Sequence, residues 1–402
     1  MNSLQGKSVV LCVTGGIAAY KAADLTSKLK KKGAEVFILM TESATEFITP
    51  LTLEVLSNNR VTVDMFNREF PWEVEHISLA KRADVFVVAP ATANVIGKAA
   101  HGIADDMVTT TLMATKAPLV IAPAMNTGMY ENPVVQQNIE LLRARGTRFV
   151  EPASGRLACG DTGKGKLADP AEIVHAIECA ATPQDLAGVS VLVTAGPTRE
   201  AMDPVRFLSN HSTGKMGYAI AQSAQMRGAS VTLVSGPVGL DAPAGVQVVP
   251  VVSAQDMRDA VMERLDKTDW VIKAAAVGDY RPKQAAEDKL KKKNDEMSVE
   301  LVRNPDILAE IGHMKRDNQL VCGFSMETRD LLDNSRAKLE KKNCDMMVAN
   351  NLRTKGAGFA HDTNVATLLY RDGTNESLSL MRKDDLADIV LDRLLQIAQS
   401  KG

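Results

Sequence analysis

The chain has 402 residues, 45% of them hydrophobic, and a formal net charge of −2 at pH 7. Its length exceeds what one ordinary core supports and favours two domains, while its charge gives no reason to expect nucleic-acid binding. The five cysteines are scattered without a Cys-x-x-Cys pair. This pattern argues against zinc and disulfide frameworks and fits a cytoplasmic location.

The first half of the chain alternates strands with helical sequence. Strands are predicted at residues 7–13, 36–40, 83–89 and 119–122. The first strand runs into a tight turn at Thr14-Gly15-Gly16, and an amphipathic helix over 17–32 follows, ended by Gly33. The alternation predicts an α/β domain with a doubly wound parallel sheet. The opening apolar run is too short for a signal peptide or a membrane span, so no membrane association is expected.

The second half restarts this scheme after a joint near residues 180–187. Strands are predicted at 189–194, 230–234, 270–274 and 320–324. Near the end, Asp372-Gly373 separates two strand-like segments, 364–370 and 376–380, and predicts a β-hairpin. We therefore expect one domain over residues 1–185 and a Rossmann-like α/β domain with an added hairpin over 186–402.

Two polar motifs in the first half directly follow buried strands, where open α/β sheets bind their ligands. One is residues 90–94, which include Thr92 and Asn94, and the other is residues 123–130, which include Asn126. Thr92 and Asn94 also suit a helix cap. The Gly15-Gly16 turn could bind a phosphate or be a plain turn. Because it lacks the G-x-G-x-x-G spacing, a dinucleotide is not favoured.

Two further residues are candidates for catalysis, although each also has a simpler, structural interpretation. His76 precedes a predicted strand, and a lone histidine is more often structural than catalytic. Cys159 lies in the glycine-rich segment 158–165, which is unsuited to a helix and predicts a mobile flap. From the residues alone, an incidental loop thiol is the preferred interpretation of Cys159.

Together these segments resemble the phosphopantothenoylcysteine decarboxylases. Residues 123–130 match P-x-M-N-x-x-M-W with Tyr130 in place of Trp, and residues 90–95 match P-A-S-A-N-T with Thr92 and Val95 substituted. The resemblance implies a flavodoxin-like sheet and trimers with FMN between subunits. It also implies which residues contact FMN, namely Gly15, Gly16, Thr41, Thr92 and Asn94.

In that family, the flavin oxidises the substrate's cysteine thiol to a thioaldehyde, CO2 leaves, and the resulting enethiolate is reduced and protonated. The resemblance gives three residues of this chain roles in that sequence. Asn126 would bind the departing carboxylate, His76 would assist the early proton and carboxylate chemistry, and Cys159 would donate the final proton.

The second half carries a motif between residues 206 and 217. Ser-Thr-Gly-Lys within it is not a P-loop, because Met216 follows Lys215 and the required earlier glycine is missing. The segment instead resembles R-x-I-S-N-x-S-S-G-x-M-G of the phosphopantothenate–cysteine ligases, with Phe207 and Leu208 in the apolar spacer. The resemblance implies CTP with Mg2+, an acyl-cytidylate intermediate, and dimers formed by this half.

This resemblance implies ligase roles for several residues. Lys289 would neutralise phosphate charge during the first step, Asn210 would position the acyl group, and Arg206 would support its turnover. The basic run that Lys289 opens could equally be a solvated loop. Lys338 and Lys342 share one face of a predicted helix, where they could clamp phosphate or form a polar surface. The implied nucleotide-binding residues are Ala275, Asp279, Lys289, Pro305, Asp306, Ile307, Leu308, Phe324, Lys338 and Lys342.

The resemblance covers nearly the whole chain and predicts a bifunctional enzyme of coenzyme A biosynthesis. Its expected substrates are 4'-phosphopantothenate, cysteine and CTP, and its expected state is a homo-oligomer as large as a dodecamer. The sequence does not identify which residues bind the expected Mg2+. Two alternatives are a non-catalytic flavin-binding regulatory protein, against which His76, Asn126 and Cys159 argue, and a nicotinamide oxidoreductase, against which the missing dinucleotide fingerprint argues.

Overall fold

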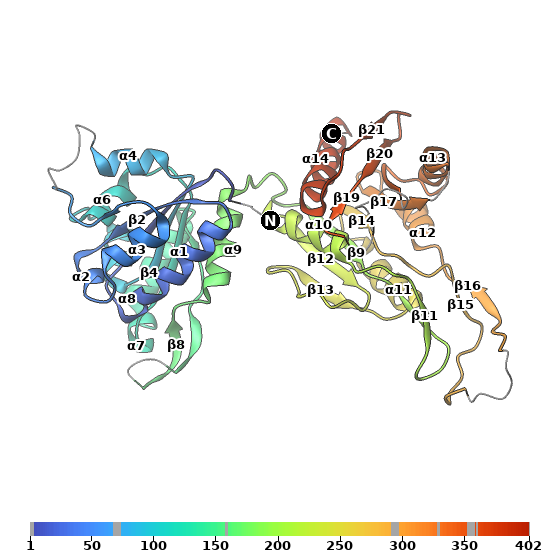
Figure 1. Ribbon diagram of the computed structural model, residues 1–402, viewed down its shortest axis with the longest axis horizontal. Coiled ribbons are helices and arrows are strands. Elements are labelled where there is room, and N and C mark those ends of the chain that lie inside the picture. Colours follow the sequence, from blue (N-terminus) through green and yellow to red (C-terminus); the bar gives the residue numbers. More distant parts are fainter. Residues whose placement is uncertain are drawn as a thin grey trace. The chain divides into compact units, whose positions relative to one another are not determined.

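The computed structural model describes residues 4–66, 74–156, 160–290, 297–327, 330–351, 358 and 361–401. Contacts divide the chain into two compact units, Met1–Pro183 and Gln184–Gly402. The division falls inside the predicted joint at residues 180–187. Both units are mixed α/β structures built on a largely parallel sheet, as predicted (Figure 1). In the described part of the chain, no helix is long and apolar enough to cross a membrane.

The first unit contains a parallel sheet with the strand order β3-β2-β1-β4-β5-β6. Its strands are β1 (Ser8–Val13), β2 (Glu35–Met40), β3 (Val61–Thr62), β4 (Val85–Ala91), β5 (Leu119–Pro123) and β6 (Arg148–Phe149). Without the two-residue edge strand β3, the order is that of flavodoxin; with it, the order is that of the dinucleotide-binding fold. The chain adds strands toward one edge of the sheet up to β3 and toward the other edge from β4 on. This topological switch point, between β1 and β4, positions the first site.

Helices cover both faces of this sheet, because successive strand residues point in opposite directions. Val9, Leu11 and Val13 of β1 enter one core and Val10 and Cys12 the other. The helical elements are η1 (Ile17–Lys21), α1 (Ala22–Lys31), α2 (Glu42–Thr45), α3 (Pro50–Ser57), α4 (Glu75–Arg82), α5 (Ala93–His101), α6 (Met107–Ala114), α7 (Thr127–Tyr130), α8 (Pro133–Ala144) and α9 (Pro170–Ala181). The single helix predicted over 17–32 therefore begins as a separate 3₁₀ turn, which follows the extended Gly16 without a side-chain cap.

The glycine-rich segment is more regular than its composition indicated. An antiparallel pair, β7 (Ala153–Arg156) and β8 (Thr162–Lys166), includes much of it. The amide of Met125 donates to the carbonyl of Gly165 at 3.0 Å, and a β-carbon at Gly165 would collide with the Met125 carbonyl oxygen. Glycine is needed here because the backbone of β8 lies directly against the strand-end motif. Residues 157–159 lie outside the described part of the chain.

The second unit contains an eight-stranded sheet with the order β13-β12-β9-β14-β17-β18-β20-β21. The first six strands are parallel, and β20 and β21 are antiparallel. The strands are β9 (Ser190–Ala195), β12 (Ser230–Ser235), β13 (Gln247–Pro250), β14 (Trp270–Lys273), β17 (Leu320–Glu327), β18 (Met346–Asn351), β20 (Ala366–Tyr370) and β21 (Asn375–Ser377). The predicted hairpin is thus present, with Gly373 at φ 89°, whereas β13 and β18 were not predicted.

Among the residues that the structure describes, five helices and three short strand pairs complete this unit. The helices are α10 (Lys215–Met226), α11 (Ala254–Leu265), α12 (Ile307–Met314), α13 (Leu331–Lys341) and α14 (Lys383–Lys401). The strand pairs are β10 (Arg199–Ala201) with β11 (Phe207–Ser209), β15 (Tyr280–Pro282) with β16 (Leu301–Arg303), and β19 (Thr363–Asn364) with β22 (Met381–Arg382). As in the first unit, the chain adds strands first toward one edge of the sheet and then toward the other. The change occurs between β9 and β14.

Candidate active sites

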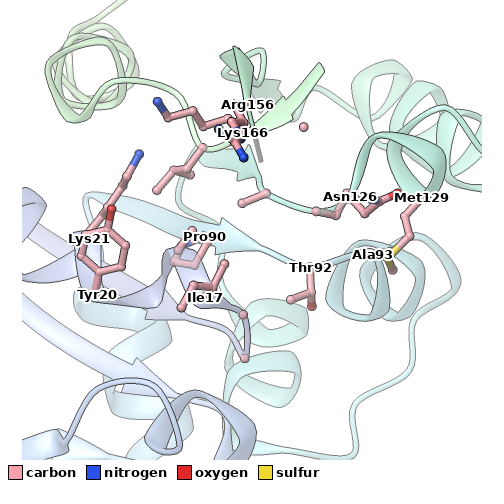
Figure 2. Close-up of a pocket in the computed structure, with 17 residues that line it drawn as sticks. Ile17, Tyr20, Lys21, Pro90, Thr92, Ala93, Asn126, Met129, Arg156 and Lys166 are labelled. Carbon is pink, nitrogen blue, oxygen red and sulfur yellow. The ribbon is translucent and has the colours of Figure 1, made fainter. Parts of the chain in front are cut away.

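The first unit has a cavity of about 500 Å³ at its switch point, where α/β sheets bind ligands. Four of the residues predicted for the site line it, namely Gly15, Gly16, Thr92 and Asn126. Figure 2 shows Tyr20 and Lys21 at one end of the cavity and Asn126 and Met129 at the other. The tertiary structure therefore brings together two strand-end motifs and the glycine turn, which are far apart in the sequence.

Hydrogen bonds fix the glycine turn against the end of β4. The Thr14 hydroxyl donates to the carbonyl of Pro90 at 2.7 Å and accepts from the amide of Thr92 at 3.0 Å. Thr92 also caps α5, since its Oγ1 accepts from the amide of Val95 at 3.4 Å. The two interpretations of Thr92 are thus compatible: it is a helix cap, and it lines the cavity.

Asn126 has both ends of its amide oriented by neighbours. Its Oδ1 accepts from the amide of Gly128 at 2.8 Å, and its Nδ2 donates to Asp161 at 2.8 Å. Asn126 begins α7 at the end of β5, so a strand, a helix start and the β7–β8 pair all determine its position. A half-buried, oriented amide that lines a cavity in this way can bind a carboxylate.

Thr41 lies at the end of β2, beside the cavity rather than among its lining residues. Its amide donates to the Val13 carbonyl at 3.1 Å, which places it at the same sheet edge as the glycine turn. Its hydroxyl oxygen is buried without a hydrogen-bond partner in the described structure. A β-carbon on Gly15 would collide with Ser43, so the turn passes this segment as closely as a backbone can.

Two other predicted residues are not among the described residues that line this cavity. Asn94 is exposed in the first turn of α5, two residues beyond Thr92 and therefore on a different face of the helix. His76 is half-buried in α4, and it is not among the described residues that line the cavity. Cys159 lies outside the described residues.

The structure also identifies cavity residues that sequence reasoning missed. Lys21, Arg156 and Lys166 line the cavity together with Tyr20. Burial, and then the neighbouring Lys166, lowers the pKa of Lys21. A basic residue soon after a glycine turn and basic residues on either side of the glycine-rich segment were the available signals. Their convergence depends on the β7–β8 pair.

The second unit has two cavities near the carboxyl ends of its strands. One, of about 140 Å³, is lined by residues 212–217 at the start of α10, by residues 274–276 after β14 and by residues 324–326 of β17. The other, of about 320 Å³, is lined by polar residues that include Lys273, Asp279, Asp306 and Lys342.

The residues predicted to bind the nucleotide do not all line one cavity. Asp279, Pro305, Asp306, Ile307 and Lys342 line the larger cavity, and Ala275 and Phe324 line the smaller one. Leu308 is buried in the core beneath. Lys338 forms an ion pair with Glu327 at 2.6 Å. Lys289 is exposed and is not among the described residues that line either cavity.

Arg206 anchors the backbone next to Lys289, at Leu290. Its guanidinium donates to Asp203 at 2.9 and 2.6 Å and to the carbonyl of Leu290 at 2.7 Å. Asp203 in turn accepts from the Leu290 amide at 3.1 Å. The Arg206 bond lowers the pKa of buried Asp203, so this carboxylate stays charged. Separately, Asn210 donates to the carbonyl of Ala276 at 2.8 Å, which fixes it beside the end of β14.

Comparison with known proteins gives two family matches. The model described as "Flavoprotein" matches residues 1–181, and the model of the "DNA/pantothenate metabolism flavoprotein C-terminal domain" matches residues 186–398. The coenzyme A biosynthesis bifunctional protein CoaBC of Bacillus subtilis (strain 168) is 49% identical over 403 residues, which cover 99% of both chains. The chain belongs to the bifunctional coenzyme A biosynthesis proteins. The Escherichia coli (strain K12) member is 43% identical over 397 residues, 98% of each chain.

Two solved structures are also similar to parts of this bifunctional chain. The crystal structure of a CoaBC C-terminal domain is 41% identical, with a TM-score of 0.47, and covers 54% of this chain and 99% of its own. A PPC decarboxylase mutant complexed with pantothenoylaminoethenethiol is 34% identical, with a TM-score of 0.39, and covers 42% and 96%.

These findings confirm the resemblance inferred from the sequence motifs. The chain is a bifunctional enzyme whose first unit is a flavoprotein domain. They favour this interpretation over a non-catalytic regulatory protein and over a nicotinamide oxidoreductase.

Proposed function

We propose that this bifunctional protein catalyses two consecutive steps. The second unit joins 4'-phosphopantothenate to cysteine at the expense of CTP, and the first unit decarboxylates the resulting phosphopantothenoylcysteine with FMN. The observation that carries this proposal is that each unit has a cavity at the carboxyl edge of its sheet, lined by residues of its own motif.

The first cavity suits FMN. Gly15 and Gly16 form a turn before a helical element, where backbone amides can hold a phosphate. The buried Thr41 hydroxyl, which lacks a partner in the described structure, offers a further hydrogen bond at the same sheet edge. Thr92 lines the cavity wall, and Asn94, which does not line this cavity, would contact an FMN bound between subunits. When bound, FMN supplies the two-electron chemistry that activates the substrate's cysteinyl carboxylate for loss.

The residues of the chain orient the substrate and move its protons. The Asn126 amide binds the carboxylate that departs, His76 assists the early proton and carboxylate chemistry, and Cys159 protonates the product. Lys21, Arg156 and Lys166 supply positive charge at the cavity, which suits the phosphate at the far end of an extended substrate.

We also propose that the sites are completed by oligomerisation. Several apolar side chains of the first unit are exposed. They include Ile17 and Tyr20, which line the cavity, and Phe47, Leu51 and Val55. Such surfaces in soluble proteins mark interfaces. They support trimers through the first unit, in which His76 reaches a cavity of a neighbouring subunit.

In the second unit, the exposed Val205, Phe207 and Leu208 around β11 support dimers, and the two contacts together would build a dodecamer. Among the described residues, the buried cysteines Cys12, Cys322 and Cys344 form no disulfide, which supports a cytoplasmic location.

The ligase site uses the nucleotide residues of both second-unit cavities, together with Lys338. Phosphopantothenate's carboxylate attacks the α-phosphate of CTP and releases pyrophosphate. Cysteine's amine then attacks the acyl carbon of the acyl-cytidylate, so that the amide forms and CMP leaves. Lys289 offsets charge in the first step. Asn210 positions the acyl group, and Arg206 supports its turnover by holding the Leu290 backbone.

Magnesium would enter this site with the nucleotide. Among the residues that the structure describes, no group of three or more His, Cys, Asp or Glu side chains could hold a metal ion. Mg2+ is commonly bound by substrate phosphates and one or two carboxylates. Asp279 and Asp306, in the larger cavity, are the candidates.

Mass spectrometry of a reaction with phosphopantothenate, cysteine and CTP tests the proposal. We expect phosphopantothenoylcysteine to form and phosphopantetheine to follow, and we expect the purified protein to be yellow. A colourless protein that takes up no added FMN would refute the decarboxylase assignment. Failure to consume CTP would refute the ligase assignment.

A further inference from the structure

Lys273 occupies an unusual place in the second unit's sheet. It is the last residue of β14, paired with Thr194 of β9 on one side and Gly323 of β17 on the other. The preceding residues Trp270, Val271 and Ile272 are buried in the core, yet Lys273 lines the 320 Å³ cavity. A charged side chain is therefore held in the middle of the sheet, at the edge where ligands bind.

Two of the other charged groups that line the cavity compensate each other. Lys342 forms an ion pair with Asp306 at 3.1 Å, and Lys338 forms one with Glu327 at 2.6 Å. Asp279 and the exposed Arg303 complete the charged lining. Within the described part of the chain, the ammonium group of Lys273 has no hydrogen bond or ion pair. Lys273 is thus the cavity's interior cation that still lacks an anionic partner.

We propose that Lys273 is a polyphosphate-binding residue of the ligase, whose ammonium group contacts phosphate oxygens of the nucleotide between Lys342 and Asp279. This inference rests on the proposed function and adds a residue to it, because none of the ligase motifs includes position 273. An ammonium group without a carboxylate partner gains most from a bound anion, since burial makes an uncompensated charge costly.

Nucleotide binding should then be coupled to protonation of Lys273. Burial, and then the neighbouring Lys342, lowers the pKa of this lysine to about 8, although Asp306 and Asp279 oppose the shift. A bound triphosphate favours the charged form and raises the pKa again. At pH 8, binding should therefore take up about half a proton per site. At pH 6.5, where Lys273 is already charged, this uptake should nearly vanish.

Calorimetric titration of the full-length protein with Mg–CTP at pH 8, in two buffers of different ionisation enthalpy, measures that uptake. The variants are Lys273→Met and Lys273→Arg, and the matched control is Lys267→Met, an exposed lysine at the end of α11. We expect Lys273→Met to bind Mg–CTP about tenfold to a hundredfold more weakly. Lys273→Arg should retain most of the affinity but lose the proton uptake, because arginine stays charged at this pH.

Lys267→Met should behave as the wild type in both respects. The decarboxylase rate and the thermal unfolding of each variant verify that it is folded. If Lys273→Met fails to fold, the Lys273→Arg result decides alone. Unchanged affinity in folded Lys273→Met, or unchanged proton uptake in Lys273→Arg, would overturn the inference while leaving the ligase assignment intact. A wild-type protein that neither binds Mg–CTP nor releases pyrophosphate would overturn both.

Discussion

The Nδ2 of Asn126 donates to the Asp161 carboxylate at 2.8 Å, although the two residues are 35 positions apart. Asn126 belongs to the strand-end motif after β5, whereas Asp161 lies between β7 and β8, two residues after Cys159. The bond couples the residue proposed to bind the carboxylate with the segment proposed to supply the final proton. The orientation of the Asn126 amide therefore depends on the position of Asp161.

Asn126→Gln should abolish decarboxylation and spare ligation. The longer side chain moves the amide away from both Gly128 and Asp161, so it can no longer present the same face to a carboxylate. A loss of at least a hundredfold in the decarboxylase rate is expected, about 2.7 kcal/mol. Pyrophosphate release measures the ligase in the same sample. Asn132→Gln, which alters an exposed helix cap, is the control and should retain both activities.

Cys159→Ser should stop decarboxylation after CO2 has left. The flavin chemistry does not require this thiol, but the final protonation requires an acid, and a hydroxyl is a far weaker acid. An enethiol product two hydrogens lighter than phosphopantetheine should accumulate, at one equivalent per flavin when oxygen is excluded. Mass spectrometry detects it. Normal yields of phosphopantetheine would rule out this role for Cys159.

Thr41→Val should weaken FMN binding without destabilising the flavin-free protein. The hydroxyl is buried and has no partner in the described structure, so its removal costs the apo form nothing and can stabilise it by about 1–3 kcal/mol. Loss of a hydrogen bond to FMN should weaken binding about tenfold. Fluorescence titration and urea unfolding measure the two effects. Thr45→Val, nearby in α2, should leave FMN affinity unchanged; equal FMN affinity of Thr41→Val and wild type would contradict the prediction.

Lys289→Gln and Asn210→Asp should impair different ligase steps. Lys289 lies on the exposed segment that Arg206 anchors, and it should act where phosphate charge develops. Lys289→Gln should reduce pyrophosphate release even without cysteine, by about 2.7–4 kcal/mol of transition-state stabilisation. Asn210→Asp should leave more of this step intact and trap the acyl-cytidylate. Cysteine-free pyrophosphate release, with mass spectrometry of the intermediate, tests the division; equal loss in both variants would remove it.

Asp345→Asn should destabilise the second unit by about 3–5 kcal/mol, because it leaves a buried lysine unpaired. Asp345 is buried and accepts from Lys315 at 2.7 Å, from Lys401 at 2.7 Å and from the Val321 amide at 2.8 Å. Urea unfolding of the second unit measures the loss, and exposed Asp241→Asn should change little.

The same carboxylate predicts a pH dependence. Burial alone would raise the Asp345 pKa, but the bonds from Lys315 and Lys401 outweigh it and hold the pKa below its ordinary value. The stabilisation is therefore complete above the unfolded pKa of about 3.9 and is lost as the pH falls through the lower folded value. Between pH 5 and acid conditions, the wild type should lose more stability than Asp345→Asn; parallel curves would contradict this assignment.

Much of the local structure followed from the sequence, because it depends on neighbours along the chain. Apolar runs such as residues 119–122 predicted strands, Asp372-Gly373 predicted the hairpin, and the motif around Asn126 predicted the flavoprotein half. Each of these signals is carried by a few adjacent residues whose backbone preferences and hydrophobicity are local properties. The two-residue strand β3 and the separate turn η1 were not predicted, because short elements contribute too little periodicity.

Only the tertiary structure decided which of these residues meet. It joined Gly15, Thr92 and Asn126 in one cavity and excluded Asn94 and His76 from it, since which face of a helix meets a cavity is set by packing. It placed Lys273 in the ligase cavity, although by sequence this residue is simply the end of a strand. Strand order and register bring together positions that are far apart in the chain, and no local preference encodes those distances.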